Sequence, residues 1–128
     1  MPQSRNKREI GGVGESAVAG FLAANGYEIL ERNFTVRGGE IDIIARKNET
    51  LCFVEVKTRR AGAMVSGERA VTVKKQRFIV RTAALYHRRY RERFGEVKCR
   101  FDVASVELEN GRVKHVNYYV AAFGSGGM

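Results

Sequence analysis

The sequence contains few of the residues that bind zinc or form disulfides. Only two of its 128 residues are cysteines, Cys52 and Cys99, and only two are histidines. Neither cysteine lies in a CxxC motif or has a histidine as a neighbour, which argues against a zinc site and against a disulfide scaffold. We expect both cysteines to be small core residues in strands.

Long hydrophobic runs and several common motifs are also missing. No segment approaches the length that spans a membrane, and the basic N-terminus carries no apolar run of the kind found in signal peptides. We therefore expect a cytoplasmic protein with no membrane partner. The chain has no internal repeats, no phosphate-binding glycine loop of the Walker type and no serine–histidine–acid constellation.

Acidic residues are outnumbered by basic ones. The chain has 23 Lys and Arg against 14 Asp and Glu, a net charge of +9. A polyanionic partner, most often nucleic acid, would account for this surplus, and attraction to an anionic membrane or simple solubility are the alternatives. The length and the ordinary apolar and charged fractions indicate one soluble domain with a substantial core.

The stretch from Gly38 to Arg60 is predicted to form a β-hairpin. Apolar and polar residues alternate on both sides of residues 47–50, which supply the turn. A two-residue loop at Asn48 and Glu49 pairs Lys47 with Thr50 and so fixes the register. In that register Asp42 lies opposite Glu55 and Glu40 lies opposite Lys57, on one face of the hairpin. The other face is apolar and carries Ile41, Ile43, Ala45, Cys52, Val54 and Val56.

The charged face of this hairpin predicts a site for a cation. Directly opposed residues have Cβ atoms about 5 Å apart, and like charges at that distance destabilise a sheet unless something neutralises them. Mg²⁺ would do so, because it binds one or two carboxylates together with waters and phosphate oxygens. The alternative is a structural salt bridge, in which Lys57 or an arginine elsewhere pairs with Asp42 and Glu55. The spacing leaves both interpretations open.

The N-terminal part is predicted to form an arm, a helix and a strand. Residues 1–12 are polar and cationic, and we expect a flexible basic arm there. A helix follows from Val13 to Asn25, closed by Gly26, and a strand from Tyr27 to about Val36 completes a three-strand antiparallel meander with the hairpin. Glu15 falls in the first turn of this helix, where an acid is favourable on electrostatic grounds alone.

A long basic helix is predicted from Val73 to Arg93, with Thr72 as its N-cap. It carries eight Lys and Arg against a single acid. A surplus without Glu–Lys pairing favours contact with phosphates, although a solvated face is the ordinary alternative. Phe78 and Leu85 lie near the basic side, where they mark either a dimer contact or a wider buried face. We define the basic stripe as Lys74, Arg77, Arg81 and Arg88, roughly opposite the apolar face of this helix.

Two further strands are predicted, Lys98–Leu108 and Val113–Phe123, joined by a type I′ turn at Asn110-Gly111. Asp102 is expected to be structural, paired with Arg100 or with a loop. One domain should therefore span residues 13–123, and we expect residues 124–128 to be a disordered tail.

These motifs resemble those of a known superfamily. The order of helix, three-strand meander, long helix and strand resembles the restriction-endonuclease-like fold. Asp42 followed by Glu55-Val56-Lys57 resembles its PD-(D/E)xK signature, with Ile41 in place of the proline. The resemblance implies an α/β fold in which a mixed central sheet, made of the meander and the C-terminal strands, is flanked by helices.

The sequence is closer to the YraN family of uncharacterised bacterial proteins, and this resemblance covers nearly the whole chain, from about residue 14 to 123. It rests on Gly-Gly-Glu-Ile-Asp at 38–42, Phe-Val-Glu-Val-Lys at 53–57 and Arg-Phe-Asp-Val at 100–103. A more distant similarity is to archaeal Holliday-junction resolvases, which carry an acid in the first helix that Glu15 matches.

The resemblance to the superfamily implies a metal-dependent site on the matched residues. Asp42 and Glu55 would hold Mg²⁺ or Mn²⁺, with the Val56 carbonyl as a third ligand. Lys57 would orient the attacking water or help to deprotonate it.

Other residues take supporting roles in this interpretation. Glu15 would complete the outer metal shell through water, and Glu40 would hold Lys57 in place or serve as an additional acid. The basic stripe, with Arg59 and Arg60, would position the DNA backbone, which supplies affinity but little sequence choice.

Three functions follow as hypotheses. The first is a metal-dependent endonuclease that hydrolyses DNA phosphodiester bonds, on branched or structured substrates, for which a two-fold homodimer is expected. The second is a nucleic-acid-binding module that keeps a nuclease-like fold without catalysis, and the third is a basic protein with an interaction role only. Because binding alone gains nothing from carboxylates that face a phosphate, the set of two acids and a lysine favours the enzyme.

Overall fold

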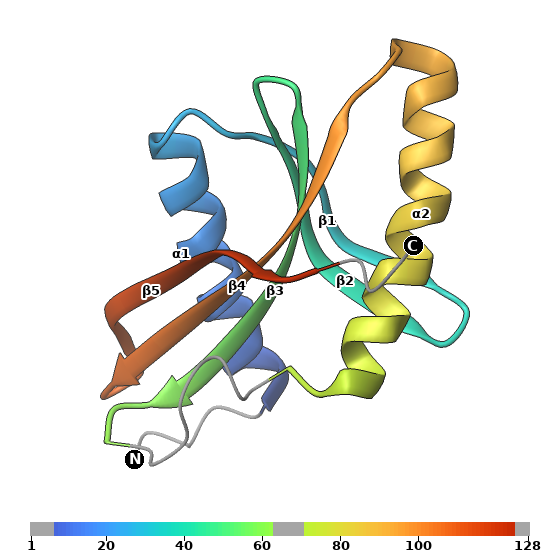
Figure 1. Ribbon diagram of the computed structural model, residues 1–128. Coiled ribbons are helices and arrows are strands. Elements are labelled where there is room, and N and C mark those ends of the chain that lie inside the picture. The colour runs from blue at the N-terminus through green and yellow to red at the C-terminus, as the bar shows by residue number, and fades with distance from the viewer. Residues whose placement is uncertain (1–6, 63–70, 125–128) are drawn as a thin grey trace.

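Two helices and five strands make up the computed structural model, which describes residues 7–62 and 71–124. In chain order the elements are α1 (Lys7–Ala24), β1 (Glu28–Val36), β2 (Gly39–Lys47), β3 (Thr50–Arg60), α2 (Val73–Phe94), β4 (Lys98–Glu109) and β5 (Arg112–Phe123). The strands form one sheet in the order β1-β2-β3-β4-β5, with α1 and α2 on opposite faces (Figure 1). Within the described residues, neither helix is long and apolar enough to cross a membrane.

The sheet is mixed. The pairs β1–β2, β2–β3 and β4–β5 are antiparallel, whereas β3 and β4 run parallel. A parallel pair needs a long crossover connection, and α2 supplies it. The α/β class, the antiparallel meander of β1 to β3 and the flanking helices are therefore confirmed, in the arrangement that the resemblance to the restriction-endonuclease-like fold implied.

Local signals in the sequence set most of the element ends as predicted. Gly26, after α1, has a φ of 86°. The Thr72 hydroxyl caps α2 by accepting the Lys75 N–H at 3.1 Å. Asn110 and Gly111 both have positive φ, 54° and 77°, as a type I′ turn requires.

The prediction for the N-terminus is wrong over residues 7–12. These residues belong to α1, which begins at Lys7 and not at Val13, while the rest of the expected arm lies outside the described residues. The helix was not predicted over these residues because of Gly11, Gly12 and Gly14. Each glycine makes the helix about 1 kcal/mol less favourable than alanine would. Of the expected tail, only Gly124 is described.

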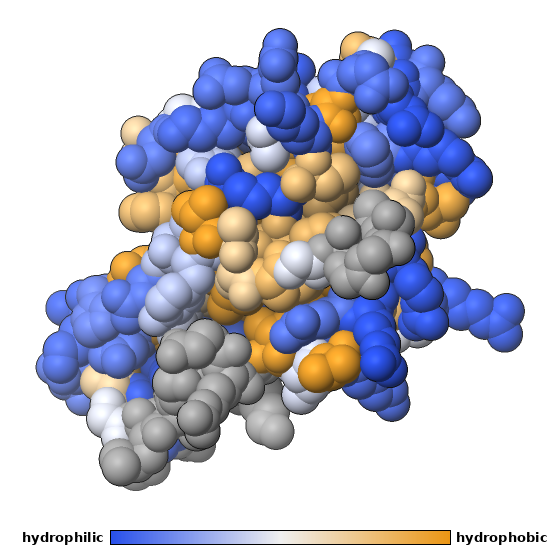
Figure 2. All heavy atoms as spheres, viewed as in Figure 1, coloured by the Kyte–Doolittle hydropathy of each residue, from blue (hydrophilic) through white to orange (hydrophobic). Residues whose placement is uncertain are grey.

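A hydrophobic layer lies on each face of the sheet. Val18 and Leu22 of α1 pack on a layer that includes Ile43 and Val54, and Ile79 and Ala83 of α2 pack on a layer that includes Ile44, Leu51 and Phe53. Because side chains alternate along β2 and β3, each of these strands contributes residues to both layers. In the view of Figure 2, apolar residues gather at the centre and hydrophilic residues cover most of the rim.

Ile41 is the exception to the predicted alternation. We expected it on the same face as Ile43, but it packs in the α2 layer together with Ile44. The physical reason is an irregularity beside Asp42. Asn33 of β1 adopts a φ of 53°, and the β1–β2 pairing runs from Arg32–Ile43 to Phe34–Ile41 around it.

Close approach of α1 to β3 depends on Gly14. A Cβ atom at this position would overlap the hydroxyl of Thr58, which is itself buried and has no hydrogen-bond partner within the described residues. The absence of a side chain at residue 14 therefore fixes the distance between α1 and the sheet, and with it the position of the neighbouring Glu15.

We expect Gly14→Ala to destabilise the protein by about 1–3 kcal/mol, as overpacking of a tight contact does. Urea unfolding followed by circular dichroism would measure the change. Gly20→Ala is the matched control, because an added Cβ at Gly20 of the same helix meets nothing within 4 Å. This control should raise the free energy of unfolding by about 0.5–1 kcal/mol through helix propensity, and equal effects of the two substitutions would contradict the packing argument.

Candidate active site

The site forms where β2 and β3 separate. Their pairing runs from Lys47–Thr50 to Ile43–Val54, in the predicted register, and ends there. The predicted opposition of Asp42 to Glu55 and of Glu40 to Lys57 is therefore wrong as backbone pairing. In its place the Val56 N–H donates to Asp42 Oδ2 at 2.8 Å. Since β3 stays paired with β4 as far as Arg60, it is β2 that leaves the ladder, and a carboxylate takes the position of a strand carbonyl.

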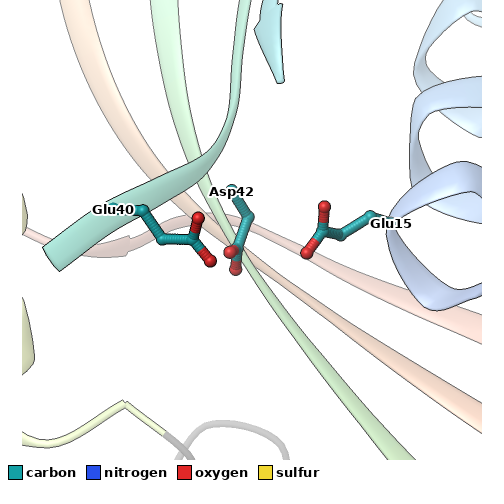
Figure 3. Close-up of side chains that lie close together, drawn as sticks. All are labelled: Glu15, Glu40 and Asp42. Carbon is teal, nitrogen blue, oxygen red and sulfur yellow. The ribbon is translucent and has the colours of Figure 1, made fainter. Parts of the chain in front are cut away.

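Three carboxylates converge at this point. Glu40 and Asp42 project from β2, and Glu15 projects toward them from α1 (Figure 3). One oxygen from each residue lies within 4.8 Å of the other two. Asp42 is buried, with 8% of its surface exposed, whereas Glu15 and Glu40 are half-buried. We call these three residues the acidic cluster; water can reach it through its two half-buried members.

Glu15 is not an acid of the first helical turn. With α1 beginning at Lys7, Glu15 is in the middle of the helix, so a favourable contact with the helix N-terminus does not explain it. Its partial burial raises the pKa of its carboxyl, and the negative charges of Asp42 and Glu40 raise that pKa further. A hydrogen bond with Asn33 acts in the opposite direction. The acidic cluster thus concentrates negative charge without full compensation.

Glu55 lies beside the acidic cluster and is only 3% exposed. Burial raises the pKa of its carboxyl to about 9, and a hydrogen bond with Asp42 and the charge of Asp42 contribute to this shift. The charges of Lys75 and Lys57 lower that pKa without restoring it to the ordinary value. The carboxyl of Asp42 is therefore close enough to Glu55 to disfavour the charged form of Glu55.

Lys75 of α2 is the residue of this site that sequence reasoning missed. Its Nζ lies 3.7 Å from Glu55 Oε2 and donates to the backbone carbonyl of Glu40 at 3.1 Å. The salt bridge considered above therefore exists, but with Lys75. The available signal was its place in the first turn of α2, three residues after the predicted cap Thr72.

Lys57 is half-buried, and its charge acts on Glu55. Within the described residues it forms no ion pair with Glu40, whose carboxyl joins the acidic cluster instead.

The residues predicted to contact phosphates lie on α2 and at the end of β3. All four residues of the basic stripe are exposed on α2, as is Arg60 at the end of β3, whereas Arg59 is half-buried. Hydrophilic residues cover much of α2, on the right of Figure 2. The first turn of α2 contains no acid, so the cations nearest the site are not neutralised from within the helix.

Asp102 lies outside the site and is structural, as predicted. It is fully buried and accepts hydrogen bonds from Arg100 at 2.9 Å, from the Tyr118 hydroxyl at 2.5 Å and from the Ala121 N–H at 2.9 Å. These contacts hold the irregular stretch of β5 opposite Asp102, where the β4–β5 register shifts.

The cysteines also have no part in the site. Cys52 is buried and Cys99 is half-buried, both are free, and burial raises the pKa of each thiol to about 11. Cys52 is a core residue, as predicted, whereas Cys99 is only partly buried and packs against the core.

Comparison with known proteins identifies relatives of the whole domain. The model of an uncharacterised protein family, UPF0102, matches residues 14–106. A UPF0102 protein of Syntrophomonas wolfei is 42% identical over 116 residues, which are 91% of this chain and 98% of that protein. One from Symbiobacterium thermophilum is 48% identical over 100 residues, covering 78% of this chain and 83% of its own. The resemblance to a family of uncharacterised bacterial proteins is confirmed.

Similarity to solved structures is weak. A repair endonuclease from Pyrococcus abyssi has a TM-score of 0.36 and 13% identity over 87% of this chain. SfsA from Pyrococcus furiosus, in complex with Ca²⁺, has a TM-score of 0.40 and 14% identity over 90% of it. The chain spans 42% and 64% of those two proteins. TM-scores of this size bear on neither fold nor function.

The raised pKa of Glu55 predicts how stability depends on pH. Between the ordinary pKa of 4.5 and the raised value, the folded protein binds more protons than the unfolded chain, so the free energy of unfolding falls as pH increases through this range. Asp42→Asn keeps an acceptor for the Val56 N–H but removes the charge that raises the pKa of Glu55. We expect the total decrease in the free energy of unfolding over this pH range to be smaller in this variant, by about 1.4 kcal/mol for each unit by which the pKa of Glu55 drops.

Urea unfolding in EDTA at several pH values from about 5 to about 9 would measure both slopes. Glu49→Gln, which neutralises an exposed acid in the β2–β3 turn, should leave the slope of the wild type unchanged. Identical slopes for the wild type and Asp42→Asn would show that the two carboxyls are not coupled.

Proposed function

The chain belongs to the uncharacterised protein family UPF0102, and from the chemistry of its acidic cluster we propose that it is a metal-dependent endonuclease that hydrolyses DNA phosphodiester bonds. The observation that carries the proposal is the convergence of the Glu15, Glu40 and Asp42 oxygens within 4.8 Å, beside the buried Glu55, in a protein of net charge +9. The match of Asp42, Glu55 and Lys57 to the PD-(D/E)xK signature supports the same reaction.

The donor set suits Mg²⁺ or Mn²⁺. Carboxylate and carbonyl oxygens are the ligands that these ions prefer, and the charge of Asp42 raises the pKa values of Glu15 and Glu55, an effect that a bound cation would oppose. Asp42 and Glu55 would hold the ion, with Glu15 and Glu40 around it. In an extended strand the N–H and C=O of one residue point to the same side, so the contact of the Val56 N–H with Asp42 supports the Val56 carbonyl as a further ligand. When bound, the ion would polarise the scissile phosphate and lower the pKa of a nearby water.

The lysines would act on the reacting groups from two sides. Lys57, on the strand that carries Glu55, would orient the attacking water and offset the charge that develops on phosphorus. Lys75 would hold Glu55 and the β2 backbone in place through the contacts it already makes. Arg59, Arg60 and the basic stripe would bind flanking phosphates, and the activity would extend to branched DNA.

A nucleic-acid-binding module without catalysis is the alternative. The acids separate the two functions, because carboxylates repel a phosphate backbone and weaken simple binding. The DNA affinity of a binding module would therefore increase when Asp42 is neutralised, whereas the endonuclease would lose its activity.

We expect the protein to nick supercoiled plasmid or cleave a four-way DNA junction when Mg²⁺ or Mn²⁺ is added. Asp42→Asn and Glu55→Gln should each lower the rate on the order of 10²–10³-fold, because each removes a carboxyl group that would hold the ion at the reacting phosphate. Gel electrophoresis of end-labelled substrates would measure the rates.

Glu107→Gln is the matched control for this assay, because Glu107 is an acid of β4 that pairs with His115 and does not belong to the acidic cluster. Its rate should equal that of the wild type. Failure to cleave any form of DNA or RNA, or cleavage that survives both substitutions, would refute the endonuclease and leave the binding module.

Metal binding itself should depend on pH. Protons compete with the ion for Glu15 and Glu55, whose pKa values are raised, so the affinity for Mn²⁺ should increase from about pH 6 to about pH 8, by up to about tenfold for each proton displaced per pH unit. Isothermal titration calorimetry would measure it. Glu15→Gln and Asp42→Asn should weaken binding, and Mn²⁺ binding that ignores both pH and these substitutions would contradict the assigned ligands.

A further inference from the structure

A groove lies beside the acidic cluster, between the first half of α2 and the β1–β2 turn. Its volume is about 640 Å³, which is within the range of ligand-binding sites. Lys75 belongs to both features, because its side chain lines the groove while its Nζ contacts Glu55. The groove therefore opens directly next to the proposed reaction centre.

The walls of the groove carry charge of one sign. Arg37 comes from the β1–β2 turn, and Lys74, Lys75 and Arg81 come from α2. No acid in residues 7–62 and 71–124 lines the groove, and within those residues only Lys75 of the four forms an ion pair. Three cations without a carboxylate partner face a space large enough for a nucleotide, which favours a phosphate-bearing ligand.

The groove also has an apolar surface between these cations. Leu85 lines the groove and is 39% exposed, and Phe78, which also lines it, is half-buried and packs against the core layer that contains Ile79. The Phe78 ring is held by the turn, because an ideal Cβ at Gly39 would lie 3.1 Å from its Cζ. The two alternatives set out for these residues resolve differently: Phe78 widens the buried face, and Leu85 stays exposed in the groove.

An apolar surface between cations matches a single nucleic-acid strand better than a duplex. Proteins bind single strands by combining cations that follow the phosphates with apolar or aromatic side chains that contact the bases. A duplex presents phosphates and sugars at its outer surface and keeps its bases stacked inside, so it would leave Phe78 and Leu85 without a contact.

We propose that this groove binds an unpaired DNA strand that leads to the acidic cluster. Arg37, Lys74 and Arg81 would bind its phosphates, and Phe78 and Leu85 would contact a base. The assignment of the strand to a scissile phosphate rests on the proposed function, but the binding does not. If both are correct, the substrate class is DNA with a single-stranded segment at or next to the cleaved bond.

Fluorescence anisotropy in EDTA, with a labelled single-stranded oligonucleotide and its blunt duplex, tests the groove without cleavage. We expect the single strand to bind at least about tenfold tighter than the duplex. Phe78→Leu, which keeps an apolar side chain but removes the ring, should weaken single-strand binding about tenfold. Leu85→Gln, at a partly exposed position, tests the same surface with less risk to folding and should weaken binding in the same direction.

A pair of arginine substitutions on α2 separates the groove from general charge. Arg81→Gln removes a cation of the groove, whereas Arg89→Gln makes the same change at an exposed residue that does not line it. Arg81→Gln should reduce the salt dependence of single-strand binding by about one phosphate contact, a slope change of roughly 0.7, and Arg89→Gln should not.

Each outcome of these measurements decides the proposal. Duplex binding equal to or tighter than single-strand binding, equal effects of Arg81→Gln and Arg89→Gln, or no binding by the wild type would overturn it. Because EDTA prevents metal-dependent cleavage, these measurements report binding alone. Preferential binding of the single strand would therefore support the groove even if the protein proved not to be an endonuclease. Cleavage that persists while groove variants bind single strands normally would remove the groove and keep the endonuclease.

Discussion

The hydrogen bond from the Val56 N–H to Asp42 is the contact on which the site depends. β3 is committed to parallel pairing with β4 along its whole length, while β2 is tied to β1. The two strands therefore part after Ile43 and Val54, and a side chain satisfies the N–H that a continued ladder would have paired. A carboxylate has about four acceptor positions, so Asp42 can accept the hydrogen bond from the Val56 N–H and still face Glu15 and Glu40.

Burial gives this arrangement its chemical character. Glu55 and Asp42 are removed from water with their carboxyls close together, and the lysines from β3 and α2 only partly offset them. Elsewhere the protein carries a large excess of positive charge. The long-range field thus favours a polyanion, whereas the negative charge inside the site would oppose a phosphate unless a cation were bound. Nucleic-acid affinity and cation affinity would then be linked, each increasing the other.

The sequence predicted those features that local chemistry determines. The hairpin register follows from alternation and a two-residue turn, the cap at Thr72 from a hydroxyl before a helix, and the turn at Asn110-Gly111 from residues that accept positive φ. Features that arise from distant contacts could not be predicted. The early start of α1 was hidden by glycines, one of which is required by Thr58, 44 residues further along. Lys75 reaches Glu55 only because α2 packs at one particular rotation on the sheet, and the irregularity at Asn33 moves Ile41 to the other layer.

The two helices contribute to the site in different ways, and the sheet explains why. α1 lies close to β3 because Gly14 has no side chain, and this proximity brings an acid of α1 to the oxygens of β2. On the other face, the Phe78 ring of α2 packs against Gly38 and Gly39. The first turn of α2 places Lys75 at the site, where α1 had placed an acid. One face of the sheet thus adds negative charge at the point where β2 and β3 part, and the other adds positive charge beside an open groove. A phosphate placed at this boundary would meet the acidic cluster on one side and ammonium and guanidinium groups on the other, which is the division of roles that the proposed phosphodiester hydrolysis would require once a cation is bound.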